Sequence, residues 1–257
     1  MINKYLSITK YALKQKSTFK LNYFGTLLSF GLHVFVFSQL WDYALKDNLL
    51  AGYSKQELIW YLIMGEFILY SCRNLYRRIA DMVKNGDIAN MLIRPVNFVL
   101  YIAFEEFSNI LQILINIVFA VVLGIIFAGP ISISFTGIVF VIVSVTISIF
   151  MQILMQILIG LIALFTEENK AFYLILSKLQ LLLVLTPLEI YPAMAQWAFY
   201  LLPITYAVYV PSKMLVHFDI NLGVQLLIMQ ITSMAALIGI TVLLYSKGVK
   251  RLNVNGG

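Results

Sequence analysis

Charged residues are scarce in this chain: Asp, Glu, Lys and Arg together make up 12% of its 257 positions, whereas hydrophobic residues make up 61%. A soluble domain of this size would aggregate with so few charges on its surface. The composition therefore excludes a soluble globular protein and indicates an integral membrane protein. Six spans of about 20 residues would use roughly half of the chain, so we expect a single transmembrane domain over residues 1–257.

The chain is also poor in the residues that form disulfides and bind metals or nucleotides. Cys72 has no second cysteine to pair with, and the only histidines are His33 and His217, so a disulfide framework and the usual zinc patterns are excluded. No Gly-Lys pair occurs, which excludes the glycine-rich phosphate loop. We therefore expect no catalytic residue, no metal site and no cofactor in this chain.

Six stretches are long and apolar enough to cross a bilayer, at residues 22–41, 58–72, 107–128, 135–165, 171–188 and 222–245. Apolar runs of this length fit helices, which satisfy their own backbone hydrogen bonds in lipid, and no alternating strand pattern is present. The predicted fold class is an all-α membrane protein with six transmembrane helices.

Lysine and arginine are distributed unevenly among the loops. With the N-terminus in the cytosol, Lys46, Lys55 and Lys213 fall outside and Lys178 lies within the fifth span. The other cations fall inside: Lys4, Lys10, Lys14, Lys16, Lys20, Arg73, Arg77, Arg78, Lys84, Arg94, Lys170, Lys247, Lys250 and Arg251. Because cytoplasmic loops are rich in Lys and Arg, both termini are predicted to be cytosolic. The net charge of +6 then needs no nucleic-acid partner.

Two segments outside the spans read as interfacial. Residues 1–20 are predicted to form an amphipathic elbow on the inner surface, since their apolar and basic side chains fall on opposite helix faces; a solvated basic tail is the alternative. The segment 189–216 is interrupted by Pro203 and predicted to be a re-entrant or interfacial helix pair on the outer face. Its aromatic residues suit the headgroup layer: Trp197, Tyr200, Tyr206 and Tyr209. A belt with no transport role explains them equally well.

The longest cytosolic connection, residues 73–98, is predicted to hold two short helices. Apolar residues recur there at helical spacing, and Asn85 and Gly86 supply a stop. Asp87 can cap a second turn, Ile88 to Ile93, which ends before Pro95. The residues off the apolar face of the first helix are charged: Arg77, Arg78, Asp81 and Lys84. We interpret this segment as a stiff element that docks on a cytosolic motor.

The stretch "NGDIANMLIRPV" in this element resembles the sequence after the second span of bacterial ABC-2-type ABC transporter permeases. The matching positions are Gly86, Leu92, Arg94 and Pro95. The resemblance extends to the N-terminal amphipathic helix, the six-span layout and the broken outer segment. It implies docking of cytosolic ABC ATPase subunits on residues 73–98, ATP and Mg bound by those subunits, and a second permease subunit, identical or related.

Several polar or adaptable residues lie inside the predicted spans. Glu66 and Lys178 are costly at membrane depth, so we expect them to face protein or water. Gln152 and Gln156 share one face of the fourth span, as do Gln112 and Asn116 on the third, and we favour hydrogen bonds between helices for both pairs. The candidates for a pathway or dimer seam are Glu66, Met151, Gln152, Gln156 and Lys178. Glu105 and Glu106 are expected to open the third helix, where carboxylates favour the N-terminus.

The sequence leads to one preferred function and two alternatives. The preferred one is the permease subunit of an ATP-driven exporter in the bacterial cell membrane, moving a lipid, glycan, drug or peptide. An autonomous secondary transporter or channel would use intramembrane charges such as Glu66 and Lys178 for coupling or selectivity. A lipid-modifying membrane enzyme would need a convergent nucleophile or metal constellation, and the sequence offers none.

Overall fold

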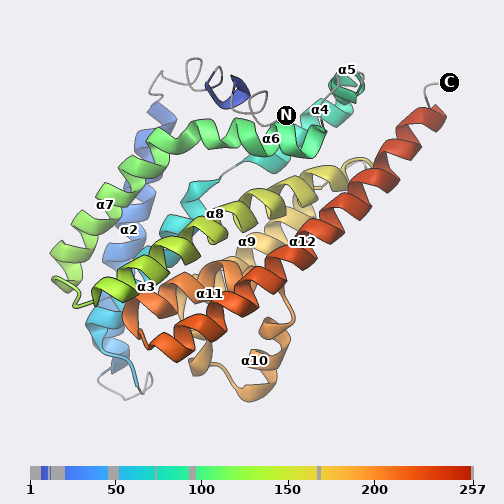
Figure 1. The fold of residues 1–257 in the computed structure, drawn as a ribbon. Coiled ribbons are helices and arrows are strands. Elements are labelled where there is room, and N and C mark those ends of the chain that lie inside the picture. The colour runs from blue at the N-terminus through green and yellow to red at the C-terminus, as the bar shows by residue number, and fades with distance from the viewer. Residues whose placement is uncertain are drawn as a thin grey trace.

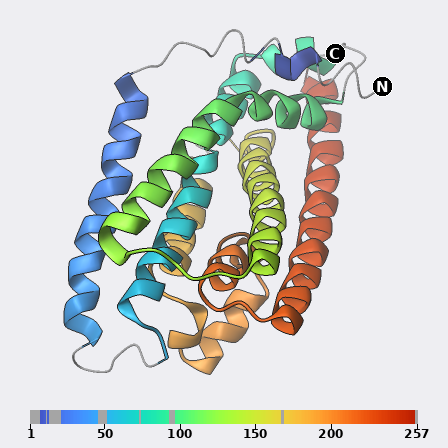
Figure 2. The same ribbon diagram turned by 60° about the vertical axis from the view of Figure 1, so that its left-hand side comes forward.

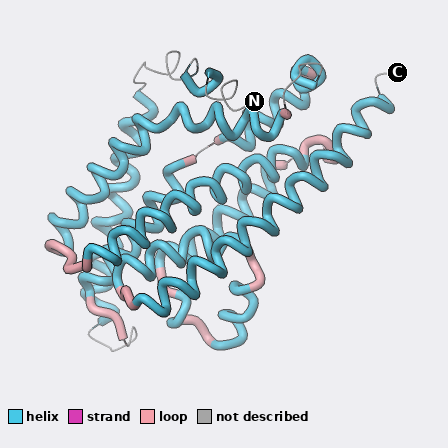
Figure 3. Tube along the Cα trace, viewed as in Figure 1, coloured by secondary structure: helices cyan, strands magenta, loops and turns pink. Residues whose placement is uncertain are grey.

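A computed structural model describes residues 7–10, 12, 21–45, 52–72, 74–92, 97–166 and 169–255, and no strand occurs within these ranges (Figures 1 and 3). The α-helices are α2 (Leu21–Ala44), α3 (Lys55–Ser71), α4 (Leu75–Lys84), α5 (Asp87–Leu92), α6 (Phe98–Glu106), α7 (Ile110–Ala128), α8 (Phe135–Ile162), α9 (Lys170–Leu185), α10 (Ala193–Tyr200), α11 (Pro203–Val216) and α12 (Ile220–Asn255). Two 3₁₀ turns, η2 (Phe107–Asn109) and η3 (Leu188–Ile190), also lie within the described ranges. The all-helical prediction is confirmed for the described residues.

Helix α3 is the centre of the bundle and contacts α2, α7, α8, α9 and α11. It begins at a capping box, in which the Ser54 hydroxyl accepts from the Glu57 amide and the Glu57 carboxylate accepts from the Ser54 amide. Most of its side chains are buried among the neighbouring helices. Gly65 permits the close approach of α9, since a Cβ atom there would meet a Val184 methyl at 2.9 Å.

Three described helices are long and apolar enough to cross a membrane alone, over Phe24–Tyr43, Phe135–Ile162 and Ile220–Arg251. The number rises to five if each of two bent helix pairs counts as one span. Helices α3 and α9 are 17 and 16 residues long, less than the roughly 20 residues of a full crossing. The described residues therefore contain three to five candidate spans by length and composition.

Both bent pairs replace a straight predicted segment. Helix α6 runs into α7 through η2 with a bend of 50°, so the predicted stretch 107–128 is the second arm of a longer, broken element. Helices α10 and α11 meet at 109°. Proline explains that break, because Pro203 has no amide hydrogen to continue α10 but suits the first turn of α11.

The bundle has two distinct ends. Figure 1 places α4, α5 and the last turns of α12 together at one end, here called the α4 end, and α10 at the other, the α10 end. In Figure 2, α12 starts near α10 and rises to the α4 end. The described part of the N-terminal segment lies at the α4 end, where the Thr9 hydroxyl donates to the Phe104 carbonyl of α6 at 2.7 Å. Most of the predicted elbow, residues 1–20, falls outside the described residues.

Candidate functional site

Helices α4 and α5 form the described part of the site that the sequence predicted in residues 73–98. Leu75 and Ile79 are buried, and the helix ends at Asn85 and Gly86, whose φ of 77° is readily adopted only by glycine. Helix α5 follows at once, with Asp87 in its first turn. The predicted amphipathic helix and its glycine stop are therefore confirmed, whereas the docking role stays a prediction.

The inner side of α4 is fixed to α8. A Cβ atom on Gly160 would lie 2.6 Å from the Ile79 Cβ atom, so the two helices approach as closely as a glycine allows. One turn away, the Tyr76 amide donates to the Gln156 side-chain oxygen at 3.2 Å, in a buried position. This bond satisfies an amide in the first turn of α4, which has no partner within its own helix.

Two further contacts connect α4 to other helices. The ring of Tyr76 stacks on Tyr173 of α9, with centroids 3.9 Å apart and planes 13° apart. The guanidinium of Arg78 bridges the carboxylates of Glu105 and Glu106 at the end of α6, with 3.3 Å between its Nη1 and the Glu106 oxygen. Helix α4 is thus joined to α6, α8 and α9 at once.

The position of these two carboxylates corrects an expectation. Glu105 and Glu106 were predicted to open the third helix, but they close α6, which starts at Phe98 after the Asn97 cap. The prediction was wrong because the helical segment begins nine residues earlier, as an arm at the α4 end. Their charge is instead compensated by Arg78.

The outer side of α4 and α5 is charged and exposed. The exposed members of the predicted docking set are Arg77, Asp81, Lys84, Gly86 and Asp87. Leu92 is the last residue of α5, and Arg94 and Pro95 lie outside the described residues. Helix α4 therefore presents three charged groups on one side, with Asp87 of α5 beside them, and contacts three helices on the other side.

Most of the predicted pathway residues are buried inside the chain. Glu66 is 2% exposed, and its carboxylate pairs with the His33 Nδ1 atom at 2.9 Å. The Gln180 amide donates to the Gln152 oxygen at 2.6 Å, between α9 and α8. Met151 is fully buried. The predicted hydrogen bonds between helices are confirmed for Gln152 and Gln156, and these side chains are enclosed by the bundle.

Lys178 lies on the opposite face of α9 from Gln180 and is exposed. Leu174 and Ile175, on the preceding turn of α9, are also exposed, at 47% and 62%. Among the residues that the structure describes, no hydrogen bond or ion pair reaches the Lys178 ammonium group. Of the five candidates for a pathway or seam, only Lys178 reaches the surface of the chain.

Comparison with known proteins matches residues 15–256 to the family model described as ABC-2 family transporter protein. The match covers nearly the whole chain, including α4, α5 and every candidate span. The chain belongs to the ABC-2 transporter family. No curated protein matches it. This ABC-2 protein is thus a multi-pass membrane protein of a transport family. The family suggests a transport subunit that is not itself an enzyme. It also implies pairing with an ATPase subunit.

The ABC-2 protein also has a polar cluster at the α10 end, which periodicity did not reveal. Glu189 of η3 accepts a hydrogen bond from Tyr209 at 2.7 Å and pairs with Lys213 of α11 at 2.6 Å. The Lys213 ammonium also donates to the Tyr53 hydroxyl at 2.7 Å. Tyr209 is only 5% exposed, so it does not belong to the aromatic belt predicted at the headgroups, whereas Trp197 is 74% exposed.

A second ion pair extends this cluster to α3. His217, at the end of α11, pairs through Nε2 with the Glu57 carboxylate at 2.9 Å, and its ring stacks on Tyr53 with centroids 4.8 Å apart. The α10 end is therefore fastened across three elements: the start of α3, η3 and α11. Sequence spacing could not show this, since Glu57 and His217 are 160 residues apart.

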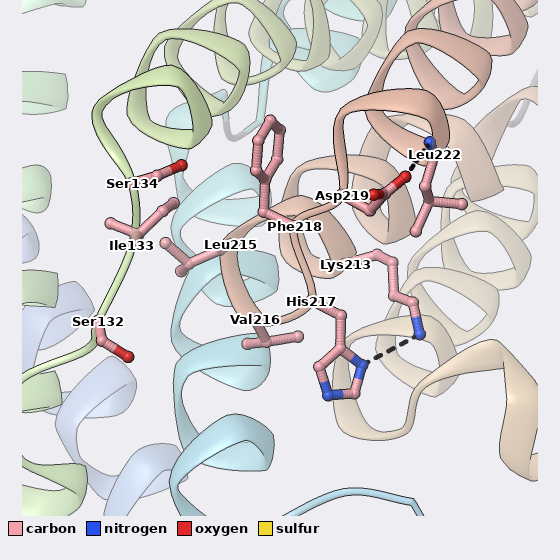
Figure 4. Close-up of a pocket in the computed structure, with 10 residues that line it drawn as sticks. All are labelled: Ser132, Ile133, Ser134, Lys213, Leu215, Val216, His217, Phe218, Asp219 and Leu222. Carbon is pink, nitrogen blue, oxygen red and sulfur yellow. Dashed lines mark hydrogen bonds between the residues drawn. The ribbon is translucent and has the colours of Figure 1, made fainter.

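An open pocket of about 590 Å³ adjoins the cluster, between the α7–α8 and α11–α12 connections. Figure 4 shows Lys213 and His217 on one side of it and Ser132 and Ser134 on the other. Asp219 accepts from the Leu222 amide at 3.0 Å and so caps α12. Lys213, His217 and Asp219 of the pocket thus already have partners, and the described residues contain no metal-binding group of histidine, cysteine or carboxylate side chains.

Electrostatics in the cluster favour ionised Glu189. Burial alone would raise the pKa of its carboxyl, but hydrogen bonds from Lys213 and Tyr209 outweigh burial and hold that pKa below the ordinary value of 4.5. Burial and the charge of Glu189 raise the pKa of the Tyr53 phenol well above its ordinary value. Glu189 is therefore negative and Tyr53 neutral at physiological pH.

Proposed function

We propose that the chain is the transmembrane permease subunit of an ATP-driven ABC exporter. The observation that carries this proposal is the two-sided geometry of α4. Its outer side offers Arg77, Asp81 and Lys84 to a partner, and its inner side is joined to α6, α8 and α9. A force applied to α4 would therefore reach three helices of the bundle through packed or paired contacts.

The proposed topology has six crossings with both termini in the cytosol. Helix α2, the α6–α7 pair, α8 and α12 supply four of them, and the shorter α3 and α9 supply two within the bundle. The α10–α11 pair is re-entrant on the outer face. This arrangement puts α4 and the basic residues Lys247, Lys250 and Arg251 on the cytosolic side, in agreement with the preference of Lys and Arg for that side.

The proposed complex contains two permease subunits, identical or related, and two cytosolic ATPase subunits in a bacterial cell membrane. ATP and Mg bind to the ATPases. Closure of the ATPases moves α4, and the Gly160 contact, the tyrosine stack and the Arg78 bridge pass this motion to α8, α9 and α6. The cargo moves outward as the two permeases separate at their shared cavity.

The test is co-purification of the chain with its candidate ATPase, followed by ATP hydrolysis in proteoliposomes. Replacing Arg77, Asp81, Lys84 and Asp87 together by alanine should abolish binding of the ATPase. The matched control removes the Asp42–Lys55 ion pair at the other end, 2.5 Å long, and should leave binding intact. Unchanged binding in the fourfold variant would refute docking on α4 and α5.

The same vesicles test the alternative of an autonomous transporter or channel. Transport that persists after the ATPase is omitted would contradict the proposed function, whichever face the ATPase contacts. Insertion and monodispersity of each variant, checked by size-exclusion chromatography, separate lost docking from misfolding.

A further inference from the structure

The outward face of α9 combines apolar side chains with one cation. Leu174, Ile175, Lys178 and Leu182 are exposed and recur at positions i, i+1, i+4 and i+8, whereas Gln180 and Leu183 on the opposite face are buried. This periodicity gives one continuous stripe along the helix. The stripe belongs to the surface of the single chain and includes a charge.

Lys178 lies halfway along the helix, eight residues after Lys170 and seven before Leu185. At 1.5 Å per residue its Cα atom is about 12 Å from the start of α9. An ammonium group at that depth is costly in hydrocarbon unless it finds a negative partner or water. The described residues give Lys178 no hydrogen bond or ion pair, so its ammonium group is open to a negative group of another molecule.

Among the residues that the structure describes, a second copy of this chain has no suitable carboxylate to offer. Glu66 is the acidic residue in the interior of a described helix that spans the bundle, and it is 2% exposed and bound to His33. The other described acids lie near the helix ends: Asp42, Glu57, Asp81, Asp87, Glu105, Glu106, Glu189 and Asp219. Two copies meeting at α9 would moreover bring two Lys178 residues toward each other, which like charges disfavour.

We propose that this stripe binds the cargo on the lipid-facing side of the chain, before the cargo enters the cavity shared by the two permeases, and that the cargo is a membrane lipid with an anionic phosphate headgroup. The phosphate pairs with Lys178, and the acyl chains lie along Leu174, Ile175 and Leu182. Lys170, exposed at the start of α9, meets the headgroup first on the side of α4. The role of this lipid as cargo rests on the proposed function, whereas its binding to the stripe does not.

The first experiment measures lipid retention without any ATPase. The purified full chain in nanodiscs of phosphatidylcholine receives a trace of phosphatidylglycerol, and native mass spectrometry counts the bound anionic lipid. Lys178→Gln should lower retention about tenfold, and Lys178→Arg should preserve it, because the contact needs a cation. Lys247→Gln, which removes an exposed lysine at the end of α12, is the matched control and should change nothing.

Three results would overturn the proposal. Full retention of the anionic lipid in Lys178→Gln would mean that the lysine side chain extends to the headgroup layer by itself and holds no lipid at the stripe. An equal loss of lipid retention in Lys247→Gln would mean that any basic residue on the surface attracts the lipid. Disulfide cross-linking of Ile175→Cys between two copies, unchanged by phosphatidylglycerol or by Lys178→Gln, would show that protein covers the stripe.

A second experiment keeps the two proposals apart. In proteoliposomes with the ATPase, phosphatidylglycerol should stimulate ATP hydrolysis by the native chain several-fold more than by Lys178→Gln. Retention of lipid without any ATPase binding would contradict the proposed function alone. ATPase binding and hydrolysis that respond equally in both chains would contradict the lipid site alone.

Discussion

Gly160 sets the distance between α4 and α8 by lacking a side chain. A Cβ atom there would meet three atoms of Ile79 at 2.6 to 3.0 Å, closer than real contacts allow. Ile79 is fully buried, so its side chain cannot swing aside into solvent. Any larger residue at position 160 therefore has to move the helix that carries the charged outer face.

Gly160→Ala should lower the free energy of unfolding by about 1–2 kcal/mol, since overpacking outweighs the gain in helix propensity. Gly239→Ala on α12 is the matched control, because a Cβ atom there meets nothing within 4 Å. Unfolding in mixed detergent micelles measures both. Equal stability of the two variants would show that α4 and α8 are farther apart than described.

The Glu189–Lys213 pair predicts how stability depends on pH. The pKa of Glu189 is lower in the folded chain than in the unfolded one, so its stabilisation is complete above the ordinary pKa of 4.5 and disappears as pH falls through the folded pKa. Glu189→Gln should therefore be less stable than the native chain at pH 7, and the difference should shrink as the solution is acidified toward pH values below 4.5. Thermal unfolding of both proteins from pH 7 downward checks this, and a constant difference would exclude an ionised Glu189.

At the scale of elements, Arg77 and Arg78 are neighbours with separate tasks. Arg77 is exposed, whereas Arg78 turns inward and holds α6 through Glu105 and Glu106. Arg77 therefore faces outward, where the proposed partner would dock, and Arg78 faces the bundle, so the proposed coupling can be divided into binding and transmission.

Arg78→Ala should keep ATPase binding but lose most of the ATP-driven transport, because α6 no longer follows α4. It should also cost about 1–2 kcal/mol of stability, since Glu105 and Glu106 lose a charged partner. Arg77→Ala should show the reverse, with weaker ATPase binding and normal stability. Binding assays and transport in proteoliposomes compare them, and similar behaviour of the two variants would contradict the division.

The sequence predicted single elements better than the contacts between them. Helical periodicity predicted α4 and Gly86 predicted where α4 ends, because both signals are local. The bend at η2 was missed because η2 (Phe107–Asn109) coincides with the first residues of the predicted span, and hydropathy does not distinguish a helix arm at the bundle end from a span. The Arg78 bridge and the Glu57–His217 pair join segments 27 or more residues apart, which periodicity cannot register.

At the scale of the whole molecule, the two ends of the bundle differ in what they hold. The α4 end carries the exposed helix and the basic residues Lys247, Lys250 and Arg251, and the α10 end carries the cluster around Glu189 and the open pocket. Helix α12 joins them: its 36 residues extend about 54 Å, well beyond a hydrocarbon layer of about 30 Å. In the proposed topology its last turns therefore lie outside the lipid, beside α4.

The two ends should be accessible from opposite sides of the membrane. Ser132→Cys, exposed in the α7–α8 connection, should react with an impermeant maleimide in intact cells, and Lys250→Cys should react only after lysis. The native Cys72 is 2% exposed and gives little background. Labelling of Lys250→Cys in intact cells would contradict the proposed orientation.

The 109° turn between α10 and α11 also bears on whether the number of membrane crossings is even or odd. A helix pair that returns to the side from which it came adds nothing to the count of crossings. Straightened into one rod, the same residues would add a crossing, and the C-terminal half of α12 would emerge on the opposite side from α4. In the proposed topology, Pro203 thus decides, some fifty residues in advance, on which side of the membrane α12 ends.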